Sequence, residues 1–168
     1  MNTRSGGNSF DPARFGRDRG TIQGAASPAQ LPRVAQELFD PEGQVEYRLE
    51  GTLTSKGEPA VHLSLKATLN LACQRCMECL PVTFAASKTL VFSHEVDELD
   101  PAEDEDEDVD AVPLVAKVDV LDLIDEEVML GLPIAPRHEE GTCEARLEDV
   151  PSVSAQSPFS VLERIKKT

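Results

Sequence analysis

Apolar residues alternate with polar ones along three successive stretches of the chain, and this pattern predicts three β-strands. Residues 45–53, 61–71 and 82–92 each carry apolar residues at alternate positions, interrupted in the third stretch by Lys88, as strands with one buried face do. The turn-forming sequence SKGE at residues 55–58 separates the first two. An antiparallel three-stranded meander is the simplest arrangement, and the apolar positions within residues 112–118 suggest a short fourth strand.

Start and stop signals predict helices around this sheet. Asp11-Pro12 and Ser27-Pro28 each place a side-chain cap before a proline at the first helical position. Asp119 caps a further segment, in which apolar residues recur at helical spacing. We expect helices over residues 12–19, 28–39 and 120–130, and a last short helix that begins at Pro158.

These elements predict one α+β domain over residues 11–168, in which helices pack on one side of an antiparallel sheet meander. Residues 1–10 are expected to be a flexible arm. Residues 95–110 hold eleven acidic residues and no basic one. Because such a segment repels itself and has little to bury, we expect a disordered, solvated loop within the domain.

The net charge of the chain limits the classes of partner that it is expected to bind. The 168 residues include 31 acidic and 16 basic ones, which gives a net charge of −15, and without the acidic run it would be −4. Such a chain is not expected to coat nucleic acid or an anionic membrane, although local RNA contacts are compatible with it. No apolar stretch approaches the roughly 20 residues of a membrane helix, and Met1–Asn8 has no apolar core typical of a secretory signal. We therefore expect a cytoplasmic protein with no membrane partner and with reduced cysteines.

The main candidate for chemistry is a cysteine cluster after the second predicted strand. Cys73 and Cys76 form a C-x-x-C turn, which lets two thiolates face one centre, as a tetrahedral zinc ion requires. His138 and Cys143, spaced H-x4-C, are the candidates for the other two ligands. Cys79 is left over and could replace either of them. A zinc ion on the first four residues would close the end of the second strand onto the loop after the helix.

Two other interpretations of the cysteines stay open. They could be reduced, partly buried thiols that hold no metal. They could also form a thioredoxin-like redox pair, but such a pair needs its C-x-x-C at a helix N-terminus beside a parallel sheet. Here the motif follows a strand of a meander.

Nothing else in the sequence favours an enzyme. The chain has no Gly-rich phosphate loop, no nucleophile elbow and no H-E-x-x-H motif. We expect a solvated helix face, and not a catalytic pair, from the carboxylates of the predicted third helix, which are Asp122, Asp125, Glu126 and Glu127. The sequence therefore predicts no catalytic activity and no small-molecule substrate.

Two charged segments are candidates for partner contacts. Arg14, Arg17 and Arg19 lie within six positions and could contact RNA phosphates from a short helix, the alternative being an ordinary charged helix face. The acidic run could contact a basic partner such as a ribosomal protein, the alternative being a solubilising loop. The central residues of this run are Glu103, Asp104, Glu105 and Asp106.

Several motifs follow one another in an order typical of a single protein family. They are L-A-C-Q-R-C at residues 71–76, the acidic run, V-L-D-L-I-D-E-E-V at 120–128, and L-P-I-A-P-R-H at 132–138 followed by Cys143. In this order they resemble the bacterial YceD family, also called the large ribosomal RNA subunit accumulation protein family. F-D-P-A-R at residues 10–14 and S-P-F-S-V-L at 157–162 fit as well, so the resemblance spans nearly the whole chain.

The resemblance implies a role in the synthesis, processing or accumulation of large-subunit (23S) ribosomal RNA in the bacterial cytoplasm. In many relatives the distal pair of the cysteine cluster is two cysteines, whereas here it is His138 and Cys143, which also suits zinc. Cys79 lies outside the motif. We expect a non-catalytic ribosome biogenesis factor that binds a large-subunit rRNA precursor or an early ribosomal protein. The alternative is a protein-binding module that shields a basic ribosomal protein.

Overall fold

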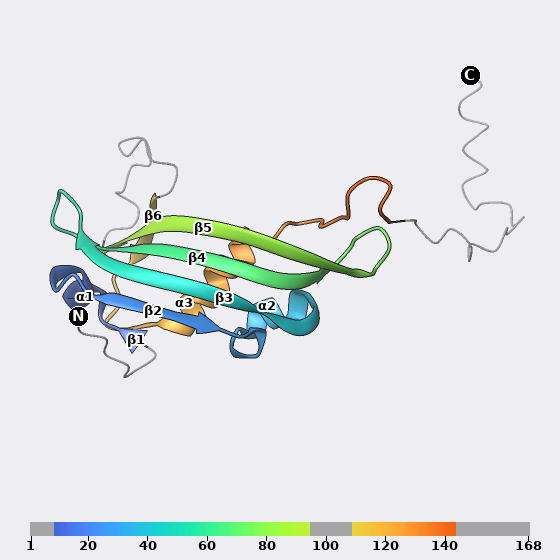
Figure 1. Cartoon of the computed structure of the whole chain (residues 1–168). Coiled ribbons are helices and arrows are strands. Elements are labelled where there is room, and N and C mark those ends of the chain that lie inside the picture. The colour runs from blue at the N-terminus through green and yellow to red at the C-terminus, as the bar shows by residue number, and fades with distance from the viewer. Residues whose placement is uncertain (1–8, 95–108, 144–168) are drawn as a thin grey trace, which may run out of the picture.

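The computed structural model describes residues 9–94 and 109–143, which form a curved sheet with helices packed behind it (Figure 1). The strands are β1 (Ser9–Phe10), β2 (Thr21–Ala26), β3 (Leu38–Leu53), β4 (Pro59–Ala72), β5 (Cys79–Ser93), β6 (Val109–Pro113) and β7 (Val118–Asp119). The helices are α1 (Pro12–Arg17), the 3-10 helix η1 (Pro28–Gln30), α2 (Pro32–Glu37) and α3 (Val120–Gly131).

The main sheet has the strand order β2-β3-β4-β5-β6. The three long strands β3, β4 and β5 are antiparallel neighbours, which confirms the predicted meander and the α+β class. β2 adds to the meander in antiparallel orientation, whereas β6 pairs with β5 in parallel. β1 and β7 pair with each other in a separate two-stranded sheet.

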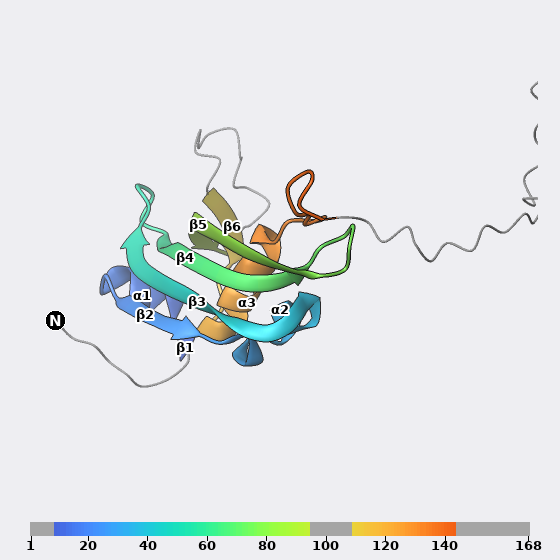
Figure 2. The same cartoon turned by 45° about the vertical axis from the view of Figure 1, so that its right-hand side comes forward.

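The core lies between the sheet and the helices. Along β4 the odd-numbered residues are buried, whereas His62, Lys66 and Thr68 are exposed on the opposite face. Figures 1 and 2 show α2 and α3 against the same side of the sheet, which leaves the other side open. The fully buried large side chains of this core are aliphatic apart from one carboxylate, and they include Leu31, Val34, Val45, Leu49, Val61, Leu63, Leu69, Leu90, Val120, Ile124, Val128 and Asp125.

Two carboxylates of α3 correct the prediction of a solvated helix face. Asp125 is 1% exposed and Glu127 is 7% exposed, although Asp122 and Glu126 lie at the surface as expected. Each buried carboxylate has partners. Asp125 accepts hydrogen bonds from backbone N–H groups of α2, and Glu127 lies 3.5 Å from the ammonium of Lys88. Burial is tolerated because these partners replace the lost water.

Several predicted boundaries differ from the observed ones, each for a local reason. The helix expected over residues 28–39 is split into η1 and α2, because Pro32 begins a new helix and the chain enters β3 at Leu38. The strand expected within residues 112–118 is replaced by β6 and β7, which lie on either side of a turn after Pro113. The helix expected over residues 12–19 ends at Arg17.

The two segments expected to be mobile are only partly described. Ser9 and Phe10 belong to the flexible arm predicted over residues 1–10, but they form β1, and Phe10 packs into the core against the ring of Phe15 at a centroid distance of 4.8 Å. Val109 and Asp110 belong to the predicted acidic loop, but they begin β6. Residues 1–8, residues 95–108 and the helix expected from Pro158 lie outside the described residues. Within the described ranges, no helix has the length and apolar character that crossing a membrane requires.

Candidate metal centre

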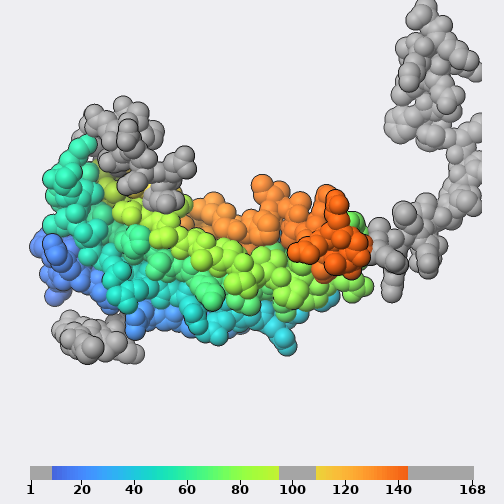
Figure 3. Space-filling model, turned by 45° about the horizontal axis from the view of Figure 1, so that its top comes forward, coloured from blue at the N-terminus to red at the C-terminus, as the bar shows by residue number. Residues whose placement is uncertain are grey.

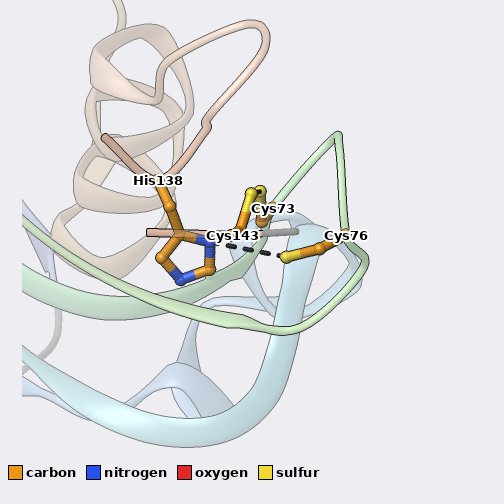
Figure 4. Close-up of side chains that lie close together, drawn as sticks. All are labelled: Cys73, Cys76, His138 and Cys143. Carbon is orange, nitrogen blue, oxygen red and sulfur yellow. Dashed lines mark hydrogen bonds between the residues drawn. The ribbon is translucent and has the colours of Figure 1, made fainter. Parts of the chain in front are cut away.

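Three cysteines and one histidine meet at one end of the sheet, as the sequence predicted. The Sγ atoms of Cys73, Cys76 and Cys143 and a ring nitrogen of His138 all lie within 4.8 Å of one another. Figure 4 shows the four side chains pointing toward one another. Cys73 is buried and the other three are half-buried, so solvent reaches the group only in part.

Two of the distances between these atoms are close to those of a tetrahedral zinc site. With Zn–S bonds of about 2.3 Å and Zn–N bonds of about 2.0 Å, two ligand sulfurs lie about 3.8 Å apart and a sulfur and a nitrogen about 3.5 Å apart. The Sγ atoms of Cys73 and Cys143 are 3.9 Å apart. Cys76 Sγ lies 3.5 Å from His138 Nδ1. The donor set, three sulfurs and one imidazole, is also one that zinc prefers.

The first half of the cluster lies in the tight turn between β4 and β5. The backbone N–H of Cys73 donates to the carbonyl of Glu78 at 3.0 Å, and that of Met77 donates to the carbonyl of Cys73 at 2.9 Å. Met77 has a φ of +63°, in the left-handed region that lets the chain reverse. This turn brings the thiols of Cys73 and Cys76 to the same side.

The second half comes from the loop that follows α3. The backbone N–H of Gln74 donates to the carbonyl of Pro136 at 2.8 Å, which joins the two loops through their main chains. Within the loop, the carbonyl of Glu139 accepts from the backbone N–H of Thr142 at 3.1 Å and from its hydroxyl at 2.7 Å. Figure 3 shows this orange segment packed onto the green end of the β4–β5 hairpin. Hydrogen bonds therefore hold the two halves together without requiring the cluster itself.

The hydrogen bonds of His138 select the nitrogen that faces the cysteines. Nε2 lies 3.1 Å from the backbone carbonyl of Cys79. A carbonyl can only accept, so Nε2 carries the hydrogen, and in the neutral ring Nδ1 keeps its lone pair. Nδ1 is the atom that faces Cys76. Fixing the ring through its second nitrogen is a common feature of metal-ligating histidines.

Arg75 is the positive group of this cluster. Its Nε donates to Cys143 Sγ at 2.8 Å and its Nη2 to the carbonyl of Glu139 at 3.3 Å. The hydrogen bond to Cys143 is the main reason that the pKa of Arg75 is raised. The guanidinium therefore contacts one of the four grouped side chains and joins the two loops a second time.

The electrostatics of the thiols also suit a cation. Burial raises the pKa of Cys73, but surrounding hydrogen bonds, the largest from the backbone N–H of Cys76, lower it to about 5. At Cys76 the backbone N–H of Glu78 lowers the pKa, but burial and the neighbouring thiols raise it overall. The opposite shifts show that the thiols of Cys73 and Cys76 do not both ionise readily on their own. A divalent cation would stabilise both thiolates. The residues present therefore fit zinc.

The structure separates Cys79 from the group and gives it another contact. Its thiol is not one of the four grouped ligands, but its carbonyl holds the ring of His138. Cys73 and Cys76 follow an antiparallel strand and do not begin a helix, so this turn lacks the arrangement that thioredoxin-like chemistry requires. The contacts of Arg75 and of the Cys79 carbonyl were missed in the sequence, although Arg75 lies inside the C-x-x-C motif.

The other candidate residues lie far from this cluster along the chain. Arg14 and Arg17 lie on α1 and Arg19 lies two residues beyond its end, all three exposed. The Arg14 Nε lies 3.4 Å from Asp18 Oδ2, in an exposed ion pair. The four acidic candidates, Glu103, Asp104, Glu105 and Asp106, lie outside the described residues.

Comparison with known families gives a match that covers more than half of the chain. The family described as "Large ribosomal RNA subunit accumulation protein YceD" matches residues 61–166. The matched part begins in β4 and includes all four residues of the cluster. No solved structure matches the chain.

Proposed function

Because the chain belongs to the YceD family of large ribosomal RNA subunit accumulation proteins, we propose that it is a non-catalytic factor of large-subunit ribosome biogenesis. It acts in the cytoplasm by binding a component of the assembling subunit, and thereby supports the accumulation of 23S ribosomal RNA. The family match over more than half of the chain is the observation that carries this proposal.

The chemistry of the cluster supports a structural role within that function. Four protein ligands leave no open position on a tetrahedral zinc ion, and zinc sites of this closed kind stabilise folds, whereas catalytic ones keep a position for water or substrate. Cys73, Cys76, His138 and Cys143 are the residues that would hold the ion. When bound, zinc supplies a cross-link between the β4–β5 turn and the loop after α3.

A large-subunit rRNA precursor is the first candidate partner, and α1 is its proposed contact. The three arginines Arg14, Arg17 and Arg19 are exposed near one end of the sheet. Arginine side chains bind phosphate oxygens through paired N–H groups and carry no base preference by themselves. Such contacts would position the protein on RNA in spite of its net charge of −15.

A basic ribosomal protein is the second candidate partner, and the acidic run is the observation that favours it. The run is long enough, and rich enough in carboxylates, to attract a polycation by charge alone. In this alternative, Glu103, Asp104, Glu105 and Asp106 contact the ribosomal protein before it joins the subunit.

Fractionation of a cell extract on a density gradient, combined with crosslinking and sequencing of bound RNA, tests these proposals. We expect the protein to migrate with large-subunit precursors. RNA crosslinks that are lost in the triple variant R14A/R17A/R19A, but not in the control R33A, would identify the RNA contact. Arg33 is a suitable control because it is an exposed arginine of α2.

The alternative partner, a basic ribosomal protein bound by the acidic run, requires a separate variant. Asp110 belongs to β6 and pairs with Lys88 at 2.7 Å, so deletion of the whole run would also damage the fold. Neutralising only E103Q/D104N/E105Q/D106N avoids this. Loss of a captured ribosomal protein with unchanged RNA crosslinks would favour the protein partner. Normal 23S rRNA levels in cells without the protein would contradict the proposed function itself.

A further inference from the structure

In the described part of the chain, the outer edge of β2 carries backbone hydrogen-bonding groups that no other strand pairs with. The carbonyl of Gly20 accepts from the N–H of Gly51 at 2.8 Å, and the same antiparallel register continues from Thr21 opposite Glu50 to Ala26 opposite Val45. In an antiparallel ladder, residues bonded to the neighbouring strand alternate with residues whose N–H and C=O point away from it. Thr21, Gln23 and Ala25 are therefore the residues of β2 that direct both groups outward.

These three residues are also open to contact. All of them are exposed. Outside the ladder with β3, their backbone N–H groups donate to no backbone group within residues 9–94 and 109–143. β2 is the border of the main sheet, as Figure 1 shows.

The two borders of the sheet differ in how they are protected. Proteins usually protect an exposed edge strand with charges, proline or a bulge, because an unprotected edge recruits another strand. The β6 border carries Asp110 and Pro113. β2 has the sequence TIQGAA, with no charge and no proline, and its pairing with β3 has no register shift. The edge of β2 is thus suited to accept a strand along its whole length.

Charge decides which strand would fit. A second copy of this chain would bring another net charge of −15 to the contact, and like charges oppose association. A basic segment would instead be attracted by the net negative charge of this chain. Glu46 is exposed on β3 and lies opposite Ala25 on β2 and Lys66 on β4. Arg48, which lies opposite Gln23, is already paired with Glu50 at 2.7 Å. The small Ala25 side chain leaves Glu46 accessible from an added strand about 9.6 Å away, two strand spacings, which lysine and glutamate side chains span together.

We propose that the edge of β2 binds an extended, basic polypeptide segment as an added β-strand. Outward N–H and C=O groups of Thr21, Gln23 and Ala25 pair with the backbone of the partner, and Glu46 selects lysine or arginine on the open face of the sheet. This mode of recognition takes affinity from main-chain hydrogen bonds and specificity from alternate side chains. The inference deepens the proposed function, because it assigns a chemical class and a contact surface to a protein partner.

A fluorescent synthetic peptide that alternates lysine with valine is the probe. We expect it to bind the full chain, and we expect amide exchange at Thr21, Gln23 and Ala25 to slow by about tenfold or more. A peptide of the same sequence with alternate backbone nitrogens methylated keeps its charge but cannot pair as a strand. We expect this control peptide to bind at least about tenfold more weakly, the loss of roughly one or two hydrogen bonds.

Q23P is the matching protein variant. The N–H of Gln23 points outward, so proline removes an edge donor without removing a bond to β3. We expect Q23P to lose peptide binding and Q23T, which keeps the N–H, to retain it. If Q23P does not fold, the comparison of the two peptides on the natural chain still decides the question.

Three results would overturn the inference. Equal binding of the methylated peptide would show attraction by charge alone, and absence of binding would remove the site. Dimers that form with increasing concentration and are lost in Q23P would assign the edge to a second copy. Density-gradient fractionation of Q23P and of the natural protein separates these results from failure of the proposed function. If the natural protein migrates with large-subunit precursors while the peptide experiments fail, the proposed function stands and only the inference about the β2 edge is rejected.

Discussion

The carboxylate of Asp125 caps the helix that begins before Val34, although the two residues lie 91 positions apart. Asp125 Oδ1 accepts from the backbone N–H of Val34 at 3.0 Å, and its Oδ2 accepts from that of Arg33 at 3.0 Å. N-terminal N–H groups of a helix have no partner within the helix. A side chain of α3 supplies that partner for α2, which has no side-chain cap of its own at Leu31.

We predict that D125A lowers the free energy of unfolding by about 2–4 kcal/mol, because it leaves one buried and one part-buried N–H group without their acceptor. D125N keeps one carbonyl acceptor and is expected to cost less. Urea denaturation measures both. D122A is the control, because Asp122 lies on the exposed side of the same helix. A loss for D125A no larger than that for D122A would contradict the capping role.

The ion pair between Glu127 and Lys88 predicts a pH dependence of stability. Burial is the main reason that the pKa of Glu127 is raised above 4.5, although Lys88 opposes the shift. The folded protein therefore holds this proton more tightly than the unfolded chain does. Its contribution to stability is fully present below the ordinary glutamate pKa and is lost as pH rises through the raised value.

Between pH 4.5 and the raised pKa of Glu127, the free energy of unfolding of the natural protein should fall as the pH rises. We predict that this fall is smaller in E127Q. Denaturation at a series of pH values measures the difference between the variant and the natural protein. E37Q changes an exposed glutamate at the end of α2 and should leave the slope as it is. Parallel curves for the natural protein and E127Q would contradict the assignment.

Metal analysis tests the cluster directly. We predict one zinc ion per chain in protein purified without chelator, and a lower melting temperature after chelation, because metal bound only to the folded state stabilises it. C73S should lose the metal. C79S is the matched control, since it removes a thiol outside the group but keeps the carbonyl that holds His138. If the purified protein contains no metal and its melting temperature does not change when chelator is added, the cysteines are better interpreted as reduced thiols that hold no metal.

Arg75 provides a sharper test of the same cluster. Zinc with three thiolates and a neutral imidazole carries one net negative charge, and Arg75 donates to Cys143 Sγ from 2.8 Å. Partners of metal ligands typically contribute about 10- to 100-fold to affinity, so we predict a loss in that range for R75A in competition with a chromogenic chelator. R137A, an exposed arginine in the other loop, should change little. Equal affinities for the two variants would exclude this role of Arg75.

The sequence alone determined the elements whose signals are local. Period-two alternation predicted β3, β4 and β5, because a strand with one buried face must place its apolar residues on that face. Asp119 was correctly predicted to cap α3, where it accepts from the N–H groups of Leu121 and Asp122. The meeting of Cys73 and Cys76 with His138 and Cys143 was also predicted, because a tetrahedral zinc site needs two more ligands than the C-x-x-C turn supplies.

Only the tertiary structure decided the features that depend on distant partners. β2 carries no strand-like alternation in TIQGAA, so its place follows from pairing with β3. The burial of Asp125 follows from α2 lying against α3, and the contact of Arg75 with Cys143 follows from the meeting of two loops. Periodicity reports which face of a segment is buried, but the partner of a polar group is fixed only when the chain folds, because that partner lies elsewhere in the sequence.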